Sequence, residues 1–455
     1  MHHRFAAGLA LAAALPWPAH AQVTREEIQQ LHQEIGALRA SYESRLRALE
    51  QRLQAAEASA TPPSTVTAAL PAAPPAPANA VAGAANAFNP AIALILSGLY
   101  TDTSRDPAGY TIGGFALPPV SEAGPGTRGF SLAESELSLA ASIDPWLQGA
   151  ANIALHPDDS VSVEEAYVQT TSLGHGLTLR AGRFFSGIGY LNAQHAHTWD
   201  FVDNPLAYQA MLGTQYGDDG VQLRLLAPTD LFLELGAELG RGRSFPGGDD
   251  SRNGAGMAAL TAHAGGDIGD SQSWRAGLSV LGAKAADQAL QLQGADGSTL
   301  DGRFAGRTRM WVADAVWKWA PGGNATRTSV KLQGEFLQSR RTGTLTPEAV
   351  SSAAYRAVQS GWYVQGVYQF LPAWRVGLRT ERLDPGSPDY GANAGLYALA
   401  DHRPDKQSVM VDFNPSEFSR VRLQLARDRS RPGPADNQLF LQYQMSLGAH
   451  GAHSY

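Results

Sequence analysis

Cysteine is absent from this chain of 455 residues, so neither a disulfide framework nor thiol chemistry is available to it. Long apolar runs are absent as well, which excludes a transmembrane helix of ordinary length. Charged residues make up only 17% of the chain, a low share for a soluble protein of this size. The formal net charge is −7 and the pI is ≈ 5.9, and this mild acidity argues against a nucleic-acid partner.

The clearest pattern that is present is an alternation of polarity near the end of the chain. Between Asn437 and Gly448 one parity is apolar and the other is mostly polar. Successive side chains of a strand point to opposite faces, so this segment predicts a strand with hydrocarbon on one side only. The same pattern recurs back to about Ile92. A bilayer admits β-structure only as a closed barrel, so the chain predicts an all-β, antiparallel transmembrane β-barrel.

Alternating runs bounded by turn residues predict sixteen strands, an even number that lets the last strand close against the first. They are expected at 91–101, 129–142, 146–156, 162–171, 176–184, 217–227, 229–241, 256–265, 273–284, 309–319, 327–340, 360–370, 374–384, 407–414, 418–428 and 437–448.

The predicted connections alternate in length. Those after even-numbered strands are short, and most of those after odd-numbered strands are long and polar: 102–128, 185–216, 242–255, 285–308, 341–359 and 385–406. An outer-membrane barrel with both termini in the periplasm has this asymmetry, with short turns inside and long loops outside. Tryptophans near the strand ends fit the same orientation, with Trp146, Trp274, Trp319 and Trp374 at the periplasmic boundary and Trp311 and Trp362 at the outer one.

The first residues predict export. His2, His3 and Arg4 precede an apolar run, and Ala19 and Ala21 place small residues at a cleavage site before Gln22. Residues 1–21 are therefore expected to be a signal peptide, and a barrel downstream of it predicts the outer membrane of a Gram-negative bacterium.

The next two segments differ from the barrel in composition. Residues 22–57 carry apolar side chains at alternating spacings of three and four, which predicts a periplasmic coiled coil and hence a homo-oligomer, with a trimer compatible. The alternative is a single helix that packs on the barrel. Residues 58–87 are rich in Ala and Pro and are expected to be an extended linker to the barrel domain at 88–455.

On the predicted strands, the positions that alternate with the apolar ones are rich in charged residues. A water-filled channel can hold many such groups because water screens them, and sixteen strands make a barrel wide enough for one. The later strands are rich in arginine, Arg427 included, but neither sign clearly prevails. The residues expected to face the lumen include Glu134, Glu136, Arg180, Arg224, Glu234, Asp314, Lys318, Lys331, Arg375, Arg379 and Arg422.

The predicted loop 185–216 is the most distinctive connection. It is long and aromatic, so we expect it to fold into the pore as a constriction rather than extend into solvent. Its candidate constriction residues are Tyr190, His195, His197, Trp199, Asp200, Asp203 and Tyr208. Two His and two Asp in close succession (His195, His197, Asp200 and Asp203) could also bind a transition metal such as zinc. The alternative is that they line a polar constriction without any cofactor.

Catalysis is not expected, because no Ser or His stands in the setting of a nucleophile with its base. The residues instead predict a porin, through which small hydrophilic solutes or ions diffuse across outer-membrane lipid.

A family resemblance points the same way. The chain resembles trimeric outer-membrane porins, particularly the phosphate-selective and carbohydrate-specific types. The order of coiled coil, linker and barrel carries this likeness, together with Glu165-Ala166-Tyr167-Val168 and the later Leu179-Arg180-Ala181-Gly182-Arg183-Phe184. The dense ladder of basic residues that phosphate selectivity implies is not seen.

A second resemblance concerns the run from Asn192 to Pro205, which is similar to proteins labelled zinc-regulated or TonB-dependent outer-membrane receptors. It implies, as the alternative function, a metal- or ligand-specific uptake receptor that uses the His/Asp loop. A TonB-dependent receptor resembles a barrel of about 22 strands plugged by an N-terminal domain. This chain has a coiled coil and a linker at that place.

Overall fold

The computed structural model describes residues 90–119, 122–248, 253–398 and 400–448. The predicted signal peptide, coiled coil and linker lie outside these ranges. Within them, no helix is both long and apolar enough to cross a membrane.

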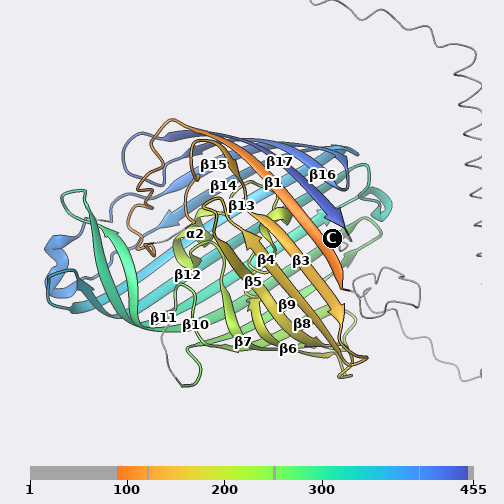
Figure 1. Cartoon of the computed structure of the whole chain (residues 1–455), viewed down its shortest axis with the longest axis horizontal. Helices are drawn as coiled ribbons and strands as arrows, with labels where there is room; N and C mark the ends of the chain where they lie inside the picture. The colour runs from red at the N-terminus through yellow and green to blue at the C-terminus, as the bar shows by residue number, and fades with distance from the viewer. Residues whose placement is uncertain (1–89, 120–121, 249–252, 399, 449–455) are drawn as a thin grey trace, which may run out of the picture. The chain divides into compact units, whose positions relative to one another are not determined.

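The described chain consists of antiparallel strands with few helices (Figure 1). The strands are β1 Ala91–Thr103, β2 Gly129–Leu132, β3 Ser135–Ser142, β4 Leu147–Leu155, β5 Val161–Thr170, β6 Leu177–Phe185, β7 Gly217–Leu226, β8 Phe232–Gly240, β9 Met257–Ile268, β10 Gln272–Gln293, β11 Thr299–Trp319, β12 Ser329–Pro347, β13 Ala353–Leu371, β14 Trp374–Asp384, β15 Asp405–Ser416, β16 Ser419–Asp428 and β17 Asp436–Gly448. The helices are η1 Ala196–Thr198, α2 Leu206–Leu212, η2 Pro321–Gly323 and η3 Gly391–Leu396.

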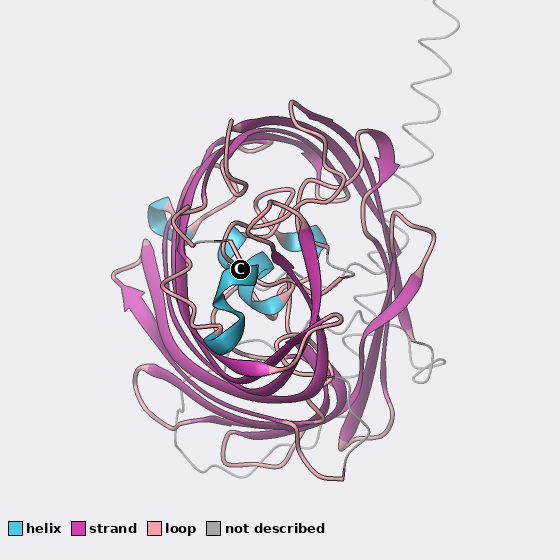
Figure 2. Ribbon diagram, turned by 90° about the vertical axis from the view of Figure 1, so that its left-hand side faces the viewer, coloured by secondary structure: helices cyan, strands magenta, loops and turns pink. Residues whose placement is uncertain are grey.

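The sheet closes on itself. Strand β1 pairs with β17 from Ala93 opposite Gly448 to Thr103 opposite Gln438, and on its other edge it pairs with both β2 and β3. Strands β2 and β3 are thus two halves of one barrel position, and the barrel has sixteen strands. The predicted fold class and strand number are confirmed. Figure 2 shows the closed ring of strands, with helices of the chain in its interior.

An interruption separates β2 from β3, where the sequence predicted one continuous strand. The backbone N–H of Ala133 donates to Ser97 O at 3.0 Å, while the N–H of Ser97 donates to the side-chain Oγ of Ser135 at 3.1 Å. A side-chain oxygen thereby replaces one backbone acceptor, and the pairing register shifts by one residue, as in a β-bulge. Glu134 lies in this interruption.

Two of the predicted long loops are wrong. Residues 285–308 and 341–359 mostly continue the hairpins β10–β11 and β12–β13, whose turns span only 294–298 and 348–352. Their inward side chains include Leu290, Phe304 and Tyr355, which pack in one buried cluster with Phe245 and others. Apolar side chains at alternate positions therefore stabilise strand structure beyond the segment that the sequence assigned to the bilayer.

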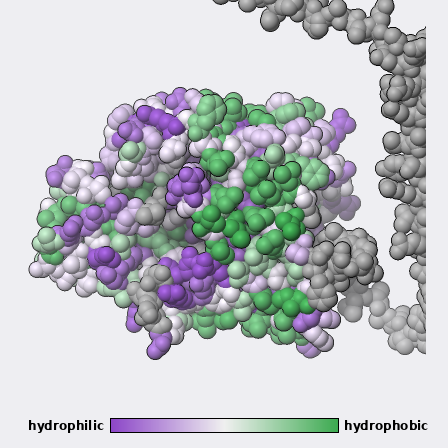
Figure 3. Space-filling view, in the orientation of Figure 1, coloured by the Kyte–Doolittle hydropathy of each residue, from purple (hydrophilic) through white to green (hydrophobic). Residues whose placement is uncertain are grey.

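The outward face is apolar along much of the barrel. Phe130, on the outward face of β2, is 90% exposed, and Leu278, Leu332 and Val364 are also exposed. Figure 3 shows apolar side chains gathered over the face that carries β1 and β3–β5 in Figure 1. Trp146 precedes β4 and Trp374 opens β14, as expected, whereas Trp311 and Trp362 lie well inside β11 and β13 because these strands are longer than predicted.

Candidate functional site in the barrel lumen

The connection between β6 and β7 folds into the barrel. We call residues 186–216 the lumen loop; it contains η1 and α2. All seven residues of α2 are buried, and the N–H of Leu206 at its start donates to Glu381 Oε2 of β14 at 2.5 Å. The loop is therefore held by the wall rather than extended into solvent.

Two aspartates attach the lumen loop to the basic side of the wall. Asp200 accepts an ion pair from Lys331 Nζ of β12 at 2.5 Å and another from Arg375 Nη1 of β14 at 3.4 Å. Asp203 pairs with Arg379 Nη2 of β14 at 2.8 Å and with Lys406 Nζ of β15 at 2.6 Å. Each carboxylate thus joins the loop to two neighbouring or nearby strands.

These cations change the acidity of both aspartates. Burial opposes the ionisation of Asp203, but Arg379 and Lys406 outweigh it and hold the pKa of its carboxyl below the ordinary range. Burial likewise opposes ionisation of Asp200, and Lys331 and Arg375 hold its pKa below the ordinary range. Since the folded-state pKa values are lowered, both ion pairs contribute their stabilisation above the ordinary Asp pKa and lose it only in more acidic solution.

The lowered pKa of Asp203 predicts how the channel responds to pH. The difference in single-channel conductance between the wild-type protein and Asp203→Asn is expected to persist from pH 7 down to about pH 4, near the ordinary Asp pKa. Bilayer recordings across this range measure it. Convergence of the two proteins above pH 4 would contradict the assignment of a lowered pKa to Asp203.

Glu335 of β12 binds the other end of the lumen loop. Its carboxylate accepts the N–H groups of Tyr190 at 3.1 Å and Leu191 at 3.0 Å, and the hydroxyl of Tyr208 at 2.8 Å. The hydroxyl of Tyr363 on β13 donates to Oε1 of the same carboxylate at 2.5 Å. One buried carboxylate thereby fixes both limbs of the loop.

Gly189 allows this approach. Its φ is +66°, and a Cβ there would lie 2.3 Å from Glu335 Oε2 and 2.8 Å from the Tyr208 hydroxyl. We expect Gly189→Ala to destabilise the folded barrel by about 1–3 kcal/mol, because the backbone is strained and the hydrogen bonds to Glu335 are displaced. Thermal unfolding measures it. Gly109→Ala is the matched control, since Gly109 has the same φ and nothing within 4 Å of the added Cβ; equal effects of the two would refute the argument.

The two histidines of the lumen loop face glutamates on the opposite wall. His195 Nδ1 lies 3.1 Å from Glu164 Oε2 and 3.2 Å from Glu136 Oε2, and its Nε2 lies 3.0 Å from Glu165 Oε2. His197 Nδ1 lies 2.9 Å from Glu136 Oε2. Burial opposes protonation of His195, but the carboxylates of Glu136, Glu164 and Glu165, which accept hydrogen bonds from its ring, raise the pKa of the ring well above the ordinary value.

The predicted four-ligand metal set does not form. Asp200 and Asp203 contact lysine and arginine on β12, β14 and β15, whereas His195 and His197 contact glutamates on β3 and β5. Proximity in sequence suggested one cluster, but the loop crosses the lumen between these residues. The glutamates were missed as partners of His195, although the adjacent acids Glu164 and Glu165 in an otherwise alternating strand were a usable signal.

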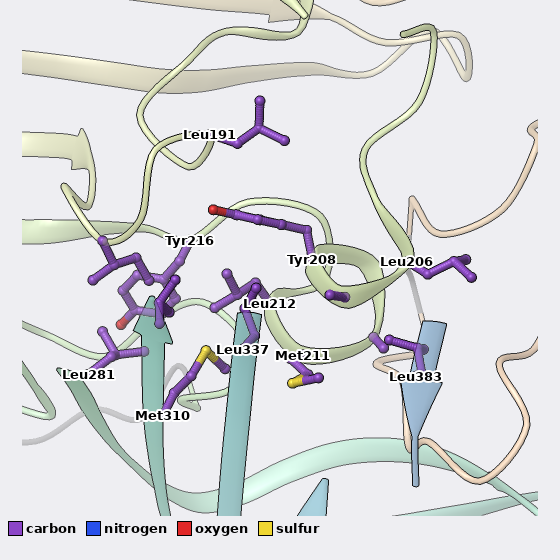
Figure 4. Close-up of a cluster of buried hydrophobic side chains, with 14 of the residues drawn as sticks. Leu191, Leu206, Tyr208, Met211, Leu212, Tyr216, Leu281, Met310, Leu337 and Leu383 are labelled. Atoms are coloured by element: carbon purple, nitrogen blue, oxygen red, sulfur yellow. The ribbon is translucent and has the colours of Figure 1, made fainter. Parts of the chain in front are cut away.

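An apolar cluster fills part of the lumen, where the sequence predicted a polar inward face. Side chains of α2 pack against Leu281, Met310, Leu337 and Leu383 of the wall (Figure 4). The first external connection also folds inward and adds Ile112, Phe115 and Leu117 to the cluster. This side of the barrel is therefore packed like a soluble core.

The remaining predicted residues lie on the inward face, with two different environments. Arg379 and Arg422 are buried and paired, Arg422 with Asp412 of β15 at 2.7 Å. Others are only partly buried and stand mostly toward the end of the barrel with the short turns, namely Arg180, Arg224, Glu234, Lys318, Lys331 and Arg375. Asp314 is buried in the wall 3.7 Å from His263. Arg427, by contrast, lies on the outward, exposed parity of β16.

The sequence and the fold were compared with those of known proteins. No established family model matches the chain. Structures similar in fold include OmpT of Vibrio cholerae with loop L8 deleted (TM-score 0.47, 10% identity, 79% of this chain and 99% of that one). Two others are OprB of Pseudomonas putida (TM-score 0.47, 15% identity, 79% and 94%) and an anion-selective porin of Comamonas acidovorans (TM-score 0.46, 10% identity, 79% and 99%).

A relative by sequence is a protein of Aquifex aeolicus (strain VF5) that is described as uncharacterized. It is 31% identical over 349 residues, which cover 72% of this chain and 70% of the relative. At this identity and coverage, the chain belongs to the same protein family as the Aquifex aeolicus protein.

Proposed function

We propose that this protein is a porin of a Gram-negative outer membrane, through which small hydrophilic solutes or ions diffuse. One observation carries the proposal: charged side chains that point into a closed barrel remain partly exposed to solvent. The side chains of Arg224, Glu234 and Lys331 are 32%, 25% and 23% exposed. A dry interior would require such groups to be fully paired, whereas a hydrated lumen accommodates them.

The lumen loop is the constriction of this channel. Its position across the barrel and its attachments to the wall support this role. The residues of the loop that we propose for the narrowing are Tyr190, His195, His197, Trp199, Asp200, Asp203 and Tyr208. Solute size is then limited by the space that the loop leaves beside the strands whose charged side chains stay exposed.

The outward face supports placement in a membrane with an anionic outer leaflet. Above the apolar zone, Lys284 of β10 lies directly opposite Arg307 of β11, and Arg309 of β11 lies opposite Arg340 of β12. All four residues are exposed. Like charges at opposite positions repel one another, so phosphate groups of outer-leaflet lipid stabilise this arrangement.

The oligomeric state is proposed from the sequence. The heptad-like spacing in residues 22–57 supports a homotrimer joined by periplasmic coiled coils, with residues 58–87 as the linker to each barrel. The alternative of a TonB-type receptor is less well supported, because such receptors need a wider barrel and a separate plug domain. Here the connection between β6 and β7 occupies the barrel, together with residues of the connection between β1 and β2.

Planar-bilayer recording of the purified full-length protein tests the proposal. Stepwise conductance is expected, with three equal closing steps for a trimer of open pores. Removal of most of the lumen loop, with residues 187–214 replaced by a short Gly/Ser linker, should raise the conductance of each step. Protein that is folded by its electrophoretic heat-modifiability but gives no conductance in either form would refute the channel.

A further inference from the structure

Besides attaching the lumen loop to the wall, the contacts of His195 define a group of potential metal ligands. We propose that Glu136, Glu164 and His195 form a binding site for a divalent transition-metal ion of the Zn²⁺ class. The inference concerns binding alone and does not depend on whether the barrel conducts.

The distances fit a metal polyhedron. Zn²⁺ binds imidazole nitrogen and carboxylate oxygen at ~2.0–2.2 Å, so neighbouring ligand atoms of a tetrahedral site lie about 3.3–3.6 Å apart. His195 Nδ1 lies 3.2 Å from Glu136 Oε2 and 3.1 Å from Glu164 Oε2. Ligand atoms of all three residues lie within 4.8 Å of one another. Small side-chain adjustments therefore suffice to centre an ion among them, with water as the fourth ligand.

A β-bulge brings the second carboxylate into the lumen. In an unbroken strand Glu164 and Glu165 would point to opposite faces. The pairing of β4 with β5 shifts register here, since Asn152 is opposite Glu165 while Ile153 is opposite Val163, so Glu164 has no partner in the ladder. Bulges re-aim side chains in this way and are common beside functional sites. As a result both carboxylates reach His195.

The residues behind the three ligands orient them. A metal-bound His usually donates its other ring N–H to a carboxylate, which fixes the ring and its tautomer. In His195, Nε2 lies 3.0 Å from Glu165 Oε2 and 2.9 Å from Asn152 Nδ2, which itself donates to Glu165 Oε2 at 3.2 Å, while Nδ1 faces Glu136 and Glu164. Ser138 Oγ donates to Glu136 Oε1 at 2.8 Å, which leaves Oε2 directed to the site.

Burial and charge favour a cation at this position. The side chains of Glu136, Glu164 and His195 are only 3%, 9% and 15% exposed. Glu165 adds a third carboxylate, which pairs with His195 itself at 3.0 Å and with Arg180 at 4.0 Å. Carboxylates gathered in a desolvated place need compensating positive charge. A divalent ion that replaces the proton on His195 Nδ1 supplies this charge, releases that proton to solvent and ties the lumen loop to β3 and β5.

The test is titration of the folded full-length protein in detergent with Co²⁺ and Zn²⁺. We expect one equivalent of Co²⁺ per chain, with the intense visible absorption of four-coordinate Co²⁺, and its loss on addition of Zn²⁺. His195→Gln and Glu164→Gln should each weaken binding at least ~100-fold, and Glu165→Gln, which alters only the partner of the ring, about 10–100-fold.

Controls locate the ion. His402→Gln, at a half-buried histidine whose ring bonds Arg429 O, and the pair His450→Gln/His453→Gln, in the terminal tail, should bind as the wild type does. Glu136→Gln provides a third ligand variant should one of the others fail to fold, as judged by heat-modifiability. The proposal is overturned if the wild type binds no Co²⁺, if folded ligand variants bind as tightly as the wild type, or if the tail variant abolishes binding.

Discussion

Asp203→Asn is expected to open the constriction and to raise both the conductance and the open-channel noise of each pore. Asp203 Oδ1 accepts bonds from Arg379 Nη2 and Gln424 Nε2, each at 2.8 Å, and Oδ2 pairs with Lys406 Nζ at 2.6 Å. Removal of its charge takes a shared carboxylate from two buried cations and leaves Arg379 only with Glu381, at 2.9 Å, and Lys406 only with Asp428, at 3.7 Å. Breaking a buried pair costs about 3–5 kcal/mol. This cost is relieved if the loop moves and water enters, so the measured consequence is a wider and less steady pore.

Asp287→Asn is the matched control for this result. Asp287 also pairs with an arginine, Arg303, at 3.2 Å, but both side chains are more than half exposed. Exposed pairs contribute about 0–1 kcal/mol, so neither conductance nor unfolding temperature should change. Unaltered conductance and noise in folded Asp203→Asn would show that the ion pairs of Asp203 do not hold the constriction.

Replacement of Arg224, Arg275 and Lys318 together by glutamine is expected to reduce an anion preference of the channel. These side chains face the lumen near the short turns, where basic residues outnumber acidic ones among the described inward-facing positions. The basic ones are Arg180, Arg224, Arg275, Lys318, Lys331, Arg375 and Arg420, and the acidic ones are Glu165, Asp200, Glu234, Asp267, Asp314 and Asp412. Partly exposed charges in a pore attract counter-ions, so anions should pass more readily than cations.

Reversal potentials in a KCl gradient measure this preference. The reversal potential of the wild type should have the sign that indicates a preference for anions, and that of the triple variant should lie closer to zero. The difference between the two reversal potentials should shrink at high salt, because salt screens the charges. Arg307→Gln removes one charge from the outward face and should leave the reversal potential unchanged. A cation-selective wild type would contradict this view of the lumen.

The lumen therefore has two sides with different physical roles. Toward β12–β16 the loop is bound by ion pairs, with Glu335 and Glu381 accepting its backbone N–H groups, while α2 packs on apolar side chains of the wall. Toward β7 and β8, Arg224 and Glu234 keep part of their side-chain surface in contact with solvent. Ion selectivity should accordingly respond to changes on the second side, and the stability and position of the lumen loop to changes on the first.

Much of the barrel follows from the sequence, because strand alternation is local. The parity of polar and apolar residues predicted sixteen strands, and the boundaries agree for elements such as β14, expected at 374–384 and observed at Trp374–Asp384. The lengths of β10–β13 were underestimated, because apolar residues such as Leu290 and Tyr355 stabilise these strands by packing against residues distant in sequence. The segments before residue 90 remain predictions.

The sequence by itself determined the closed barrel, the inward position of the charged residues and the segment that enters the lumen. Each of these depends on periodicity or loop length, which are properties of a single stretch of chain. Only the tertiary structure decided which residues meet there. Asp200 and Asp203 meet the cations of β12, β14 and β15, while His195, close to them in sequence, meets Glu136 and Glu164 on the other wall. The reason is that the loop crosses the lumen within a few residues, and a bulge in β5 turns Glu164 inward.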